Sequence, residues 1–353
     1  MYETFLHVYI YTMEQHGGKR YGEGVKGYVE DNECIKHDTA TFCHYLQSSS
    51  IETFTLYGLN RHFLITDTNE IESIKKRLYA KQALVVKTYK NMFVKSAFMD
   101  ELKGFANIIR IYKSPAKFTT VQYAFKYKSV PIYGLSIKHS RHSRHSTNNQ
   151  SFHTFAEGCS DTLDNFPFAS ISQFMKFVRE IRTSLEHIHG DKYNHNDIKP
   201  DNMIYCKKSD MFKLIDWELS YKKPVTPPPF YKIGTPVYNH PIKFYCGGIP
   251  AVACRELMEQ FSQLKSKHRW LRQLKSFTIY RERARKSFDD ILALNLSVKK
   301  MHNMFFPYYD NFSLALTIAF LAEKQRFRPP KAIIDELMYP FEHTREFFTP
   351  LNI

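Results

Sequence analysis

The sequence predicts a chain of mixed strands and helices, in which helices dominate the second half. Residues 83–89 (ALVVKTY) form a short apolar run bounded by charge, which is typical of a buried strand. Residues 170–189 repeat apolar side chains at helical spacing, and Ser170 or Ser172 can cap the start of that helix. The 353 residues, 43% of them hydrophobic, suffice for one large domain of two lobes or for two ordinary domains.

The first half of the chain offers three further signals. Residues 1–15 are apolar but carry Glu3 and lack a basic start and a cleavage site, so they indicate a strand or short helix rather than a signal peptide. Residues 93–110 have a helical pattern that ends near the strand-like FANIIRIY. Residues 136–150, SIKHSRHSRHSTNNQ, predict a low-complexity basic loop, either a flexible insert or a docking patch for anions.

The second half alternates turns with helical patterns. Gly190 is expected to end the first long helix, and MIY and FKLI, separated by a polar break, predict a hairpin. A proline-rich loop follows, since repeated prolines exclude a helix or a central strand. The ranges concerned are 203–215 for the hairpin, 224–229 for the loop, 251–300 for a basic helical region, 310–322 for a central apolar helix and 329–348 for a last helix.

Charge and cysteine content limit the partners of the chain. A formal net charge of +15 favours acidic partners, which include nucleotides, acidic proteins, nucleic acid and anionic membranes. No apolar run is long enough to span a bilayer. The six cysteines match neither a zinc site nor a dense disulfide framework, so we expect free thiols in a reducing compartment.

Residues 195–202, HNDIKPDN, place a proton acceptor, a cation and an amide within one short loop. Phosphoryl transfer requires such positioning and charge neutralisation more than covalent chemistry from the protein. Asp197 can accept or orient the proton of an attacking hydroxyl, and Lys199 can reach the transferred phosphate. Asn202 and Asp216 are oxygen ligands of the kind that Mg²⁺ prefers.

These motifs resemble those of the eukaryotic-type protein kinase family. HNDIKPDN matches the family's catalytic loop, and LIDWE at 214–218 stands where the family has its magnesium-binding Asp-Phe-Gly. GTPVYNHP at 234–241 resembles the substrate-side loop, where Thr235 is expected to support the catalytic loop. Lys199 and Pro200 are the residues that serine/threonine kinases carry there.

The resemblance covers roughly residues 20–340 and implies a bilobal α+β fold. We expect a β-rich N-lobe at 1–157, with an N-terminal extension and insertions. A mainly helical C-lobe is expected at 158–353, with a helical insertion at about 247–300. Asp310, with Ser313, fits the start of the family's central C-lobe helix.

The resemblance also implies a binding site for ATP. Glycines in GEGVKGYV would cover the phosphates, and a lysine in a strand would contact the α and β phosphates beside a helix glutamate. Backbone groups of the hinge between lobes would meet the adenine. The residues expected in these roles are Gly22, Gly24, Gly27, Lys87, Glu101, Glu157 and Cys159, with Asp100 adjacent to Glu101.

The expected function is therefore that of a cytoplasmic serine/threonine protein kinase that uses ATP and Mg²⁺. An acidic partner at the basic insertions is expected, and a nucleic-acid partner is not, because no aromatic-basic stacking motif accompanies the charge. Two alternatives remain open. HND followed by LIDWE also resembles choline and aminoglycoside kinases, and the departures from the family pattern are compatible with a pseudokinase scaffold.

Three departures distinguish the chain from the family pattern. Asn196 replaces the arginine of His-Arg-Asp, Glu218 replaces the glycine after Asp-Phe, and Ile242 replaces the glutamate that would pair with Arg328. Such divergence resembles kinases of large DNA viruses or of bacterial effectors, whose place of action would be the host cytoplasm.

The absent arginine generates a prediction, because in the family that arginine answers a phosphate on the activation loop. We expect activity that does not depend on phosphorylation of residues 224–229. Mass spectrometry of active protein, before and after phosphatase treatment, checks this. Loss of activity on dephosphorylation, together with a phosphate at Thr226, would contradict it.

Overall fold

A computed structural model describes the chain in parts. The described residues are 23–24, 27–31, 51–57, 62–69, 72, 84–89, 109–111, 123–125, 132–139, 150–157, 159, 162–207, 209–223, 234–256 and 275–348. The chain divides into two compact units, of which unit 1 comprises Met1–Lys126 and Val130–Cys159, and unit 2 comprises Tyr127–Ser129 and Ser160–Ile353. The described part has both strands and helices, which confirms the expected α+β class at this coarse level.

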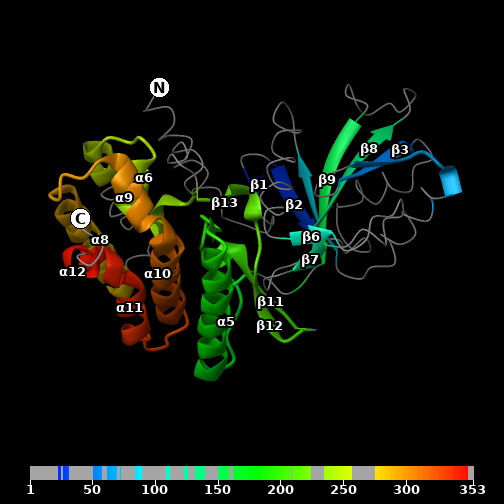
Figure 1. Ribbon diagram of the computed structural model, residues 1–353. Helices are drawn as coiled ribbons and strands as arrows, with labels where there is room; N and C mark the ends of the chain where they lie inside the picture. Colours follow the sequence, from blue (N-terminus) through cyan, green and yellow to red (C-terminus); the bar gives the residue numbers. More distant parts are fainter. Residues whose placement is uncertain are drawn as a thin grey trace. The chain divides into compact units, whose positions relative to one another are not determined.

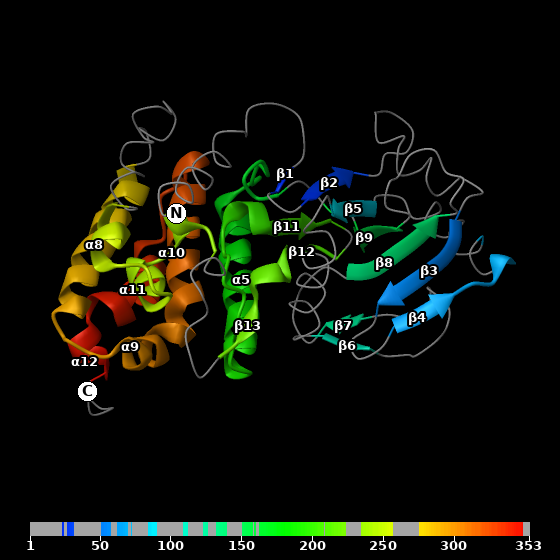
Figure 2. The ribbon, with the colours of Figure 1, turned by 90° about the horizontal axis from the view of Figure 1, so that it is seen from above.

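Unit 1 contains an antiparallel sheet of seven strands in the order β1-β2-β5-β9-β8-β3-β4, and β6 pairs with β7 separately (Figure 1). Figure 2 shows β8, β3 and β4 side by side at one end of that order. The strands are β1 (Glu23–Gly24), β2 (Gly27–Asp31), β3 (Ile51–Tyr57), β4 (His62–Ile65), β5 (Leu84–Tyr89), β6 (Ile109–Ile111), β7 (Tyr123–Phe125), β8 (Ile132–His139) and β9 (Gln150–Glu157).

Two expectations for unit 1 are confirmed and one is wrong in part. The apolar run at 83–89 is strand β5, and the strand expected within FANIIRIY is β6. The basic loop expected at 136–150 is not a loop at either end, because β8 extends to His139 and β9 begins at Gln150. The alternation of apolar and polar residues in LSIK continues the strand pattern into the basic region, which explains the longer strand.

Unit 2 is mainly helical in its described part, with short strands near its start. Its elements are α5 (Ile171–Gly190), β10 (Tyr193–Asn194), η3 (Pro200–Asn202), β11 (Met203–Cys206), β12 (Met211–Leu214), η4 (Trp217–Leu219), β13 (Tyr221–Lys222), η6 (Pro236–Tyr238), α6 (Pro241–Cys246), α8 (Lys275–Leu292), α9 (Val298–Phe305), η8 (Phe306–Tyr308), α10 (Tyr309–Lys324), α11 (Lys331–Glu342) and α12 (Thr344–Phe348), in which η denotes a 3₁₀ helix.

Helix α5 forms where the apolar spacing predicted it. Ser170 is its N-cap, and the Ser170 hydroxyl accepts the backbone N–H of Gln173 at 3.2 Å, which satisfies one of the free amides at the helix start. The apolar stripe from Phe174 to Ile188 is buried. The helix includes Gly190, and Asp191 is the C-cap.

Helix α10 is the centre of unit 2, as its composition predicted. It packs against α5, α8 and α11, and these helices lie around it in both ribbon views (Figures 1 and 2). Thirteen of its residues are buried, from Tyr309 to Ala322, so the helix is apolar on nearly all sides. A helix that is apolar on nearly all sides is buried in the core. Groups that bind to its first turn, which contains Asp310, are therefore fixed relative to the core.

Two helical regions are divided more finely than the sequence predicted. Helix α8 ends at Leu292, and the chain turns through Asn295, with a positive φ of 49°, before α9 begins at Val298. The last region is split at His343 into α11 and α12, shortly after Pro340, a residue that weakens a helix interior.

The expectation of free thiols is wrong for two of the cysteines. Cys159 and Cys206 are disulfide-bonded, whereas Cys246 and Cys254 are free and buried. Within unit 2, the Leu163 N–H donates to the Met203 carbonyl at 2.8 Å, so the backbone at Leu163 runs beside β11, which ends at Cys206. Burial raises the pKa of Cys246 and of Cys254 to about 12.

No helix in the described ranges is long and apolar enough to cross a membrane.

The aromatic cluster between α5 and the β11–β12 hairpin generates a stability prediction. Phe177 is fully buried, and the centroid of its ring lies within 5.7 Å of the ring centroids of Phe168, Phe174 and Phe212. Phe177→Ala is expected to lower the free energy of unfolding by about 3–5 kcal/mol, because it removes a large buried side chain and leaves a cavity.

Urea titration followed by circular dichroism measures that change. Ile171→Ala is the matched control, since Ile171 lies on the same helix but is half exposed, and we expect it to change stability by less than about 0.5 kcal/mol. Equal losses in the two variants would contradict the assignment of Phe177 to the core.

Candidate functional site

The β11–β12 hairpin brings the two predicted metal ligands to one place. Its antiparallel register pairs Met203 with Leu214, and the Ile215 N–H donates to the Asn202 carbonyl at 3.0 Å. Asp216 is the next residue and has a left-handed backbone, with φ 63° and ψ 68°. Such a conformation is uncommon outside glycine and is concentrated at functional sites.

The carboxylate of Asp197 is the point where several parts of unit 2 meet. Its Oδ1 accepts the backbone N–H of Thr235 at 2.7 Å, and its Oδ2 accepts Nδ2 of Asn202 at 2.8 Å. Lys199 Nζ lies 3.0 Å from the same Oδ2. Asp197 is only 6% exposed, so these donors replace water around a nearly buried charge.

Lys199 connects residues 195–202, which we call the catalytic loop after the family motif that they resemble, to the loop at 234–240. Its Nζ donates to Oγ1 of Thr235 at 2.9 Å, while it also pairs with Asp197. Burial would lower the pKa of Lys199, but the charges of Asp197, Asp201 and Asp216 outweigh that effect and raise it. Lys199 is therefore a permanent cation surrounded by carboxylates.

The same contacts fix the charge of Asp197. Burial would raise the pKa of this carboxyl group, but the charge of Lys199 and the hydrogen bonds from Lys199 and Thr235 lower it to about 2. A group with so low a pKa is ionised at every physiological pH. It can orient a hydroxyl strongly by accepting its hydrogen bond, although it is a weak base.

A buried carboxylate on α10 holds the backbone of the catalytic loop. Asp310 is fully buried, and its two oxygens accept the backbone N–H groups of His195 at 2.6 Å and of Asn196 at 2.8 Å. Burial would raise the pKa of Asp310, but the hydrogen bond with His189 and the surrounding positive charge lower it. The loop is thus fastened to the central helix of the unit.

His195 supports the loop from inside. Its Nε2 lies 2.9 Å from the carbonyl oxygen of Ile215, and its Nδ1 lies 3.4 Å from the backbone nitrogen of Asp197. The imidazole contacts the buried ring of Trp217, with the ring centroids 4.4 Å apart. Burial lowers the pKa of His195, so a neutral ring that donates from Nε2 and accepts at Nδ1 suits both contacts.

Gly234 allows the substrate-side loop to approach the catalytic loop. Its φ is +86°, and a Cβ atom at this position would overlap the carbonyl oxygen of Asn196 and lie 3.0 Å from Oδ1 of Asp197. Only glycine fits there without displacing the backbone. The motif at 234–241 contains Gly234, but no local sequence pattern indicates this close approach.

Asn202 and Asp216 fit a magnesium ion chemically. Both hydrogen bonds from Asn202 to Asp197 come from the amide nitrogen, which leaves the amide oxygen for a cation. One amide oxygen and one carboxylate, together with phosphate oxygens, are ligands that Mg²⁺ prefers. Across the described stretches, no three His, Cys, Asp or Glu side chains gather in a group that could hold a metal ion.

The predicted ATP-binding residues lie in unit 1 or at its end. Gly24 pairs with Gly27 across the β1–β2 hairpin, and Lys87 in β5 lies opposite Val29 of β2. Glu157 is the last residue of β9, and Cys159 follows it. Gly22 and Glu101 lie outside the described residues. The structure therefore brings Asp197, Lys199, Asn202 and Thr235 together in unit 2, and places part of the glycine hairpin beside the strand of Lys87 in unit 1.

Three contributors to the site were not predicted: Asn239, His240 and Lys243. Asn239 Nδ2 donates to the Thr235 carbonyl at 2.7 Å, and the backbone carbonyl of Asn239 accepts Nη1 of Arg281 at 2.9 Å. His240 Nδ1 accepts the N–H of Ile242, which caps α6. A short polar pair before a proline is a signal for such a cap. Nothing in the local pattern indicates that Lys243 is buried.

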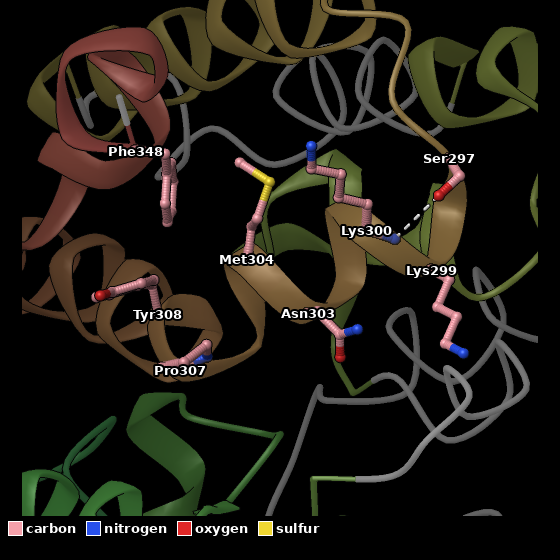
Figure 3. Close-up of a pocket in the computed structure, with 8 residues that line it drawn as sticks. All are labelled: Ser297, Lys299, Lys300, Asn303, Met304, Pro307, Tyr308 and Phe348. Carbon is pink, nitrogen blue, oxygen red and sulfur yellow. Dashed lines mark hydrogen bonds between the residues drawn. The ribbon is translucent and has the colours of Figure 1, made fainter. Parts of the chain in front are cut away.

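A hollow of about 440 Å³ lies elsewhere in unit 2, between α9, η8 and α12 (Figure 3). Met304, Tyr308 and Phe348 are among its lining residues. Lys299 and Lys300 also line it, but Figure 3 shows that their side chains extend in different directions, so they do not converge on one ligand. The hollow contains none of the predicted site residues.

The close approach of Gly234 generates a third prediction. Gly248 also has a positive φ, of 97°, but a Cβ atom there would meet nothing within 4 Å. Gly248→Ala is expected to lower stability by about 1–2 kcal/mol through backbone strain alone. Gly234→Ala is expected to lose a further 1–3 kcal/mol or so through overlap with the catalytic loop.

Thermal unfolding of both variants measures the difference. Equal losses would show that Gly234 is required only for its backbone conformation and not for contact with Asn196.

No protein-family model matches this chain, and no curated protein matches it. Its function must therefore be inferred from its own residues and their contacts.

Proposed function

We propose that the chain is a protein kinase of bilobal, kinase-like fold, which transfers the γ-phosphate of ATP to serine or threonine hydroxyls of proteins. The observation that carries this proposal is the arrangement around Asp197. One carboxylate receives donors from Asn202, Lys199 and Thr235. Thr235 also accepts from Lys199, which links the catalytic loop to the loop at 234–240, and the Asn202 carbonyl accepts the N–H of Ile215, the residue before Asp216.

Asp197 would act on the substrate hydroxyl. In the transfer step, the hydroxyl oxygen forms a bond to the γ-phosphorus, the bond from that phosphorus to the bridging oxygen breaks, and ADP leaves. Because the pKa of Asp197 is lowered to about 2, its carboxylate directs the hydroxyl and accepts its hydrogen bond. The hydroxyl proton would move to that carboxylate only as the phosphate ester forms, and from there to water.

Lys199 and the metal ligands would neutralise the phosphate. The Lys199 ammonium stays charged and lies beside Asp197, where the transferred group would pass. Asn202 and Asp216 would hold Mg²⁺, which neutralises charge on the phosphates when it is bound. No step requires covalent attachment to the protein.

Backbone register within unit 1 supports the nucleotide half of the proposal. Strand β2, the second strand of the glycine hairpin, pairs with β5. Strand β5 also pairs with β9, which ends at Glu157. Lys87 therefore lies in the strand next to the glycine hairpin. Backbone N–H groups of a glycine turn are suited to phosphate oxygens.

The loop at 234–240 favours a protein acceptor over a small molecule. This loop contributes its own backbone to Asp197 and is fastened to the catalytic loop by Lys199, so it stands beside the group that would bind the hydroxyl. A polypeptide needs such an extended surface, whereas choline or an aminoglycoside does not. The proposal implies a cytoplasmic place of action, because the enzyme would draw on cytoplasmic ATP.

The fourth prediction concerns transfer itself. Purified protein is offered labelled Mg-ATP with a protein mixture in one tube, and with choline and aminoglycosides in another. We expect label on serine or threonine, and we expect Asp197→Ala and Asp216→Ala to reduce it at least about a hundredfold, with unchanged circular dichroism. Asp290→Ala is the matched control, since Asp290 is an exposed carboxylate on α8.

Each other outcome has a distinct meaning. Label on a small molecule would replace the protein substrate with a small-molecule one. ATP binding without any transfer would favour a scaffold. Wild-type turnover in Asp216→Ala would refute the metal assignment.

A further inference from the structure

A buried lysine contacts both loops of the candidate site, the catalytic loop and the loop at 234–240. Lys243 on α6 is 3% exposed. Its Nζ donates to the backbone carbonyl of Asn196 at 2.9 Å and to Oδ1 of Asn239 at 2.6 Å, and it lies 5.7 Å from the centre of the Tyr309 ring. One ammonium group therefore contacts the catalytic loop, the substrate-side loop and the central helix.

Stability alone does not explain a lysine at this position. Its helix neighbours Ile242 and Phe244 are buried and apolar, and burying an ammonium group is costly unless it is well paired. Replacing buried charges with apolar residues of similar volume is often neutral or stabilising. Since the hydrogen bonds of this buried lysine go to two loops, we infer that its role is to hold these loops in position.

The contact with Asn196 acts directly on the residue before Asp197. Asn196 has a left-handed backbone with a φ of 75°. Its N–H is held by Asp310, and its carbonyl is held by Lys243. The peptide group that leads into Asp197 is thus fixed, which limits the positions that the Asp197 carboxylate can adopt.

The contact with Asn239 extends the same hold to the other loop. Asn239 Oδ1 accepts from Lys243 and also from Oγ of Ser313 at 3.2 Å, while its Nδ2 donates to the Thr235 carbonyl. Thr235 in turn donates its N–H to Asp197. Lys243 therefore reaches Asp197 by two routes, one through Asn196 and one through Asn239 and Thr235.

We propose that Lys243 is a positioning residue, whose ammonium group holds the catalytic loop against the substrate-side loop and keeps Asp197 aligned for transfer without a phosphate on the chain. The catalytic meaning of this inference rests on the proposed kinase function. The structural meaning, that Lys243 fastens the two loops together, does not.

The surroundings of Lys243 make its charge testable by pH. Burial lowers the pKa of Lys243 to about 8, against the opposing charges of Asp310 and Asp197. The other titratable groups nearby change charge outside the range from pH 7 to 9. The pKa values of Asp197, Asp310 and His240 are lowered, that of Tyr309 is raised well above 10, and that of Arg281 is lowered to about 10.

Activity and stability are then expected to move in opposite directions above pH 8. Lys243 loses its charge as the pH rises through its folded pKa, so the transfer rate falls. Its pKa is lower in the folded state than the usual 10.5, so between these values the unfolded state binds more protons, and the contribution of this group to stability rises with pH. If unfolding caused the fall in rate, the stability would decrease together with the rate as the pH rises.

The fifth prediction is tested with Lys243→Met, which keeps most of the stem and removes the charge and the donors. We expect kcat to fall between about tenfold and about a hundredfold with little change in KM for ATP, and we expect the fall in rate above pH 8 to disappear. Backbone amides of residues 195–199 and 234–240 should exchange faster with deuterium. Cys246→Ala is the matched control, since Cys246 is buried on the same helix and its thiol points to the Val298 carbonyl.

The outcomes separate this inference from the proposed function. Wild-type kcat and unchanged exchange in Lys243→Met would overturn the role of Lys243. Absence of transfer by the wild-type protein would overturn the kinase proposal, while the exchange comparison still decides whether Lys243 fastens the loops. If Lys243→Met does not fold, Lys243→Gln, which keeps a donor without the charge, and the pH profile of the wild-type protein decide the question.

Discussion

The candidate site depends on one buried carboxylate at the start of the central helix. Asp310 is fully buried, and its oxygens accept two consecutive backbone N–H groups of the catalytic loop. A carboxylate in the first turn of a helix is favoured by the helix dipole, and backbone donors compensate for the loss of water. Because α10 is packed on nearly all sides, the loop has no freedom to shift relative to the core. The backbone that leads into Asp197 is therefore held by the central helix.

Local sequence signals predicted unit 2 better than unit 1. Helix α5 and its Ser170 cap, the β11–β12 hairpin and the apolar helix α10 depend on contacts within a few turns, which periodicity and capping residues record. In unit 1, strands β3 and β4 went unpredicted. Strand β3 pairs with β8, which is distant in sequence, and such pairing depends on a partner that no local pattern names. The break between α8 and α9 contains Asn295, which has a left-handed backbone. Asparagine tolerates that conformation, but its presence in a sequence does not predict it.

The candidate site was predictable where residue types carry chemistry and not where the backbone carries it. Asp197, Lys199 and Asn202 were predictable because a carboxylate, an ammonium and an amide group stand close together in one short loop, and Thr235 was predicted from the resemblance of residues 234–241 to a family motif. The structure gathers all four within hydrogen-bond distance. The reason for Gly234 appears only when a Cβ atom is placed against Asn196. Burial of Lys243 was hidden, because most lysines extend their charged ends into water.

On the proposed function, the asparagine at position 196 and the buried Lys243 belong together. Asn196 replaces the arginine of the family pattern, and Lys243 supplies a cation to the catalytic loop in its place. Asparagine is among the few residues other than glycine that adopt a left-handed backbone readily, and Asn196 does so with a φ of 75°. That conformation turns the Asn196 carbonyl toward α6, where Lys243 donates to it. In the family pattern, residue 196 would be an arginine that pairs with a phosphate group on the activation loop. Here the cation comes from α6, and its acceptors, a backbone carbonyl and the Asn239 amide, are permanent parts of the fold. A contact between permanent partners needs no second enzyme to form it, so the catalytic loop would be held in place as soon as unit 2 has folded.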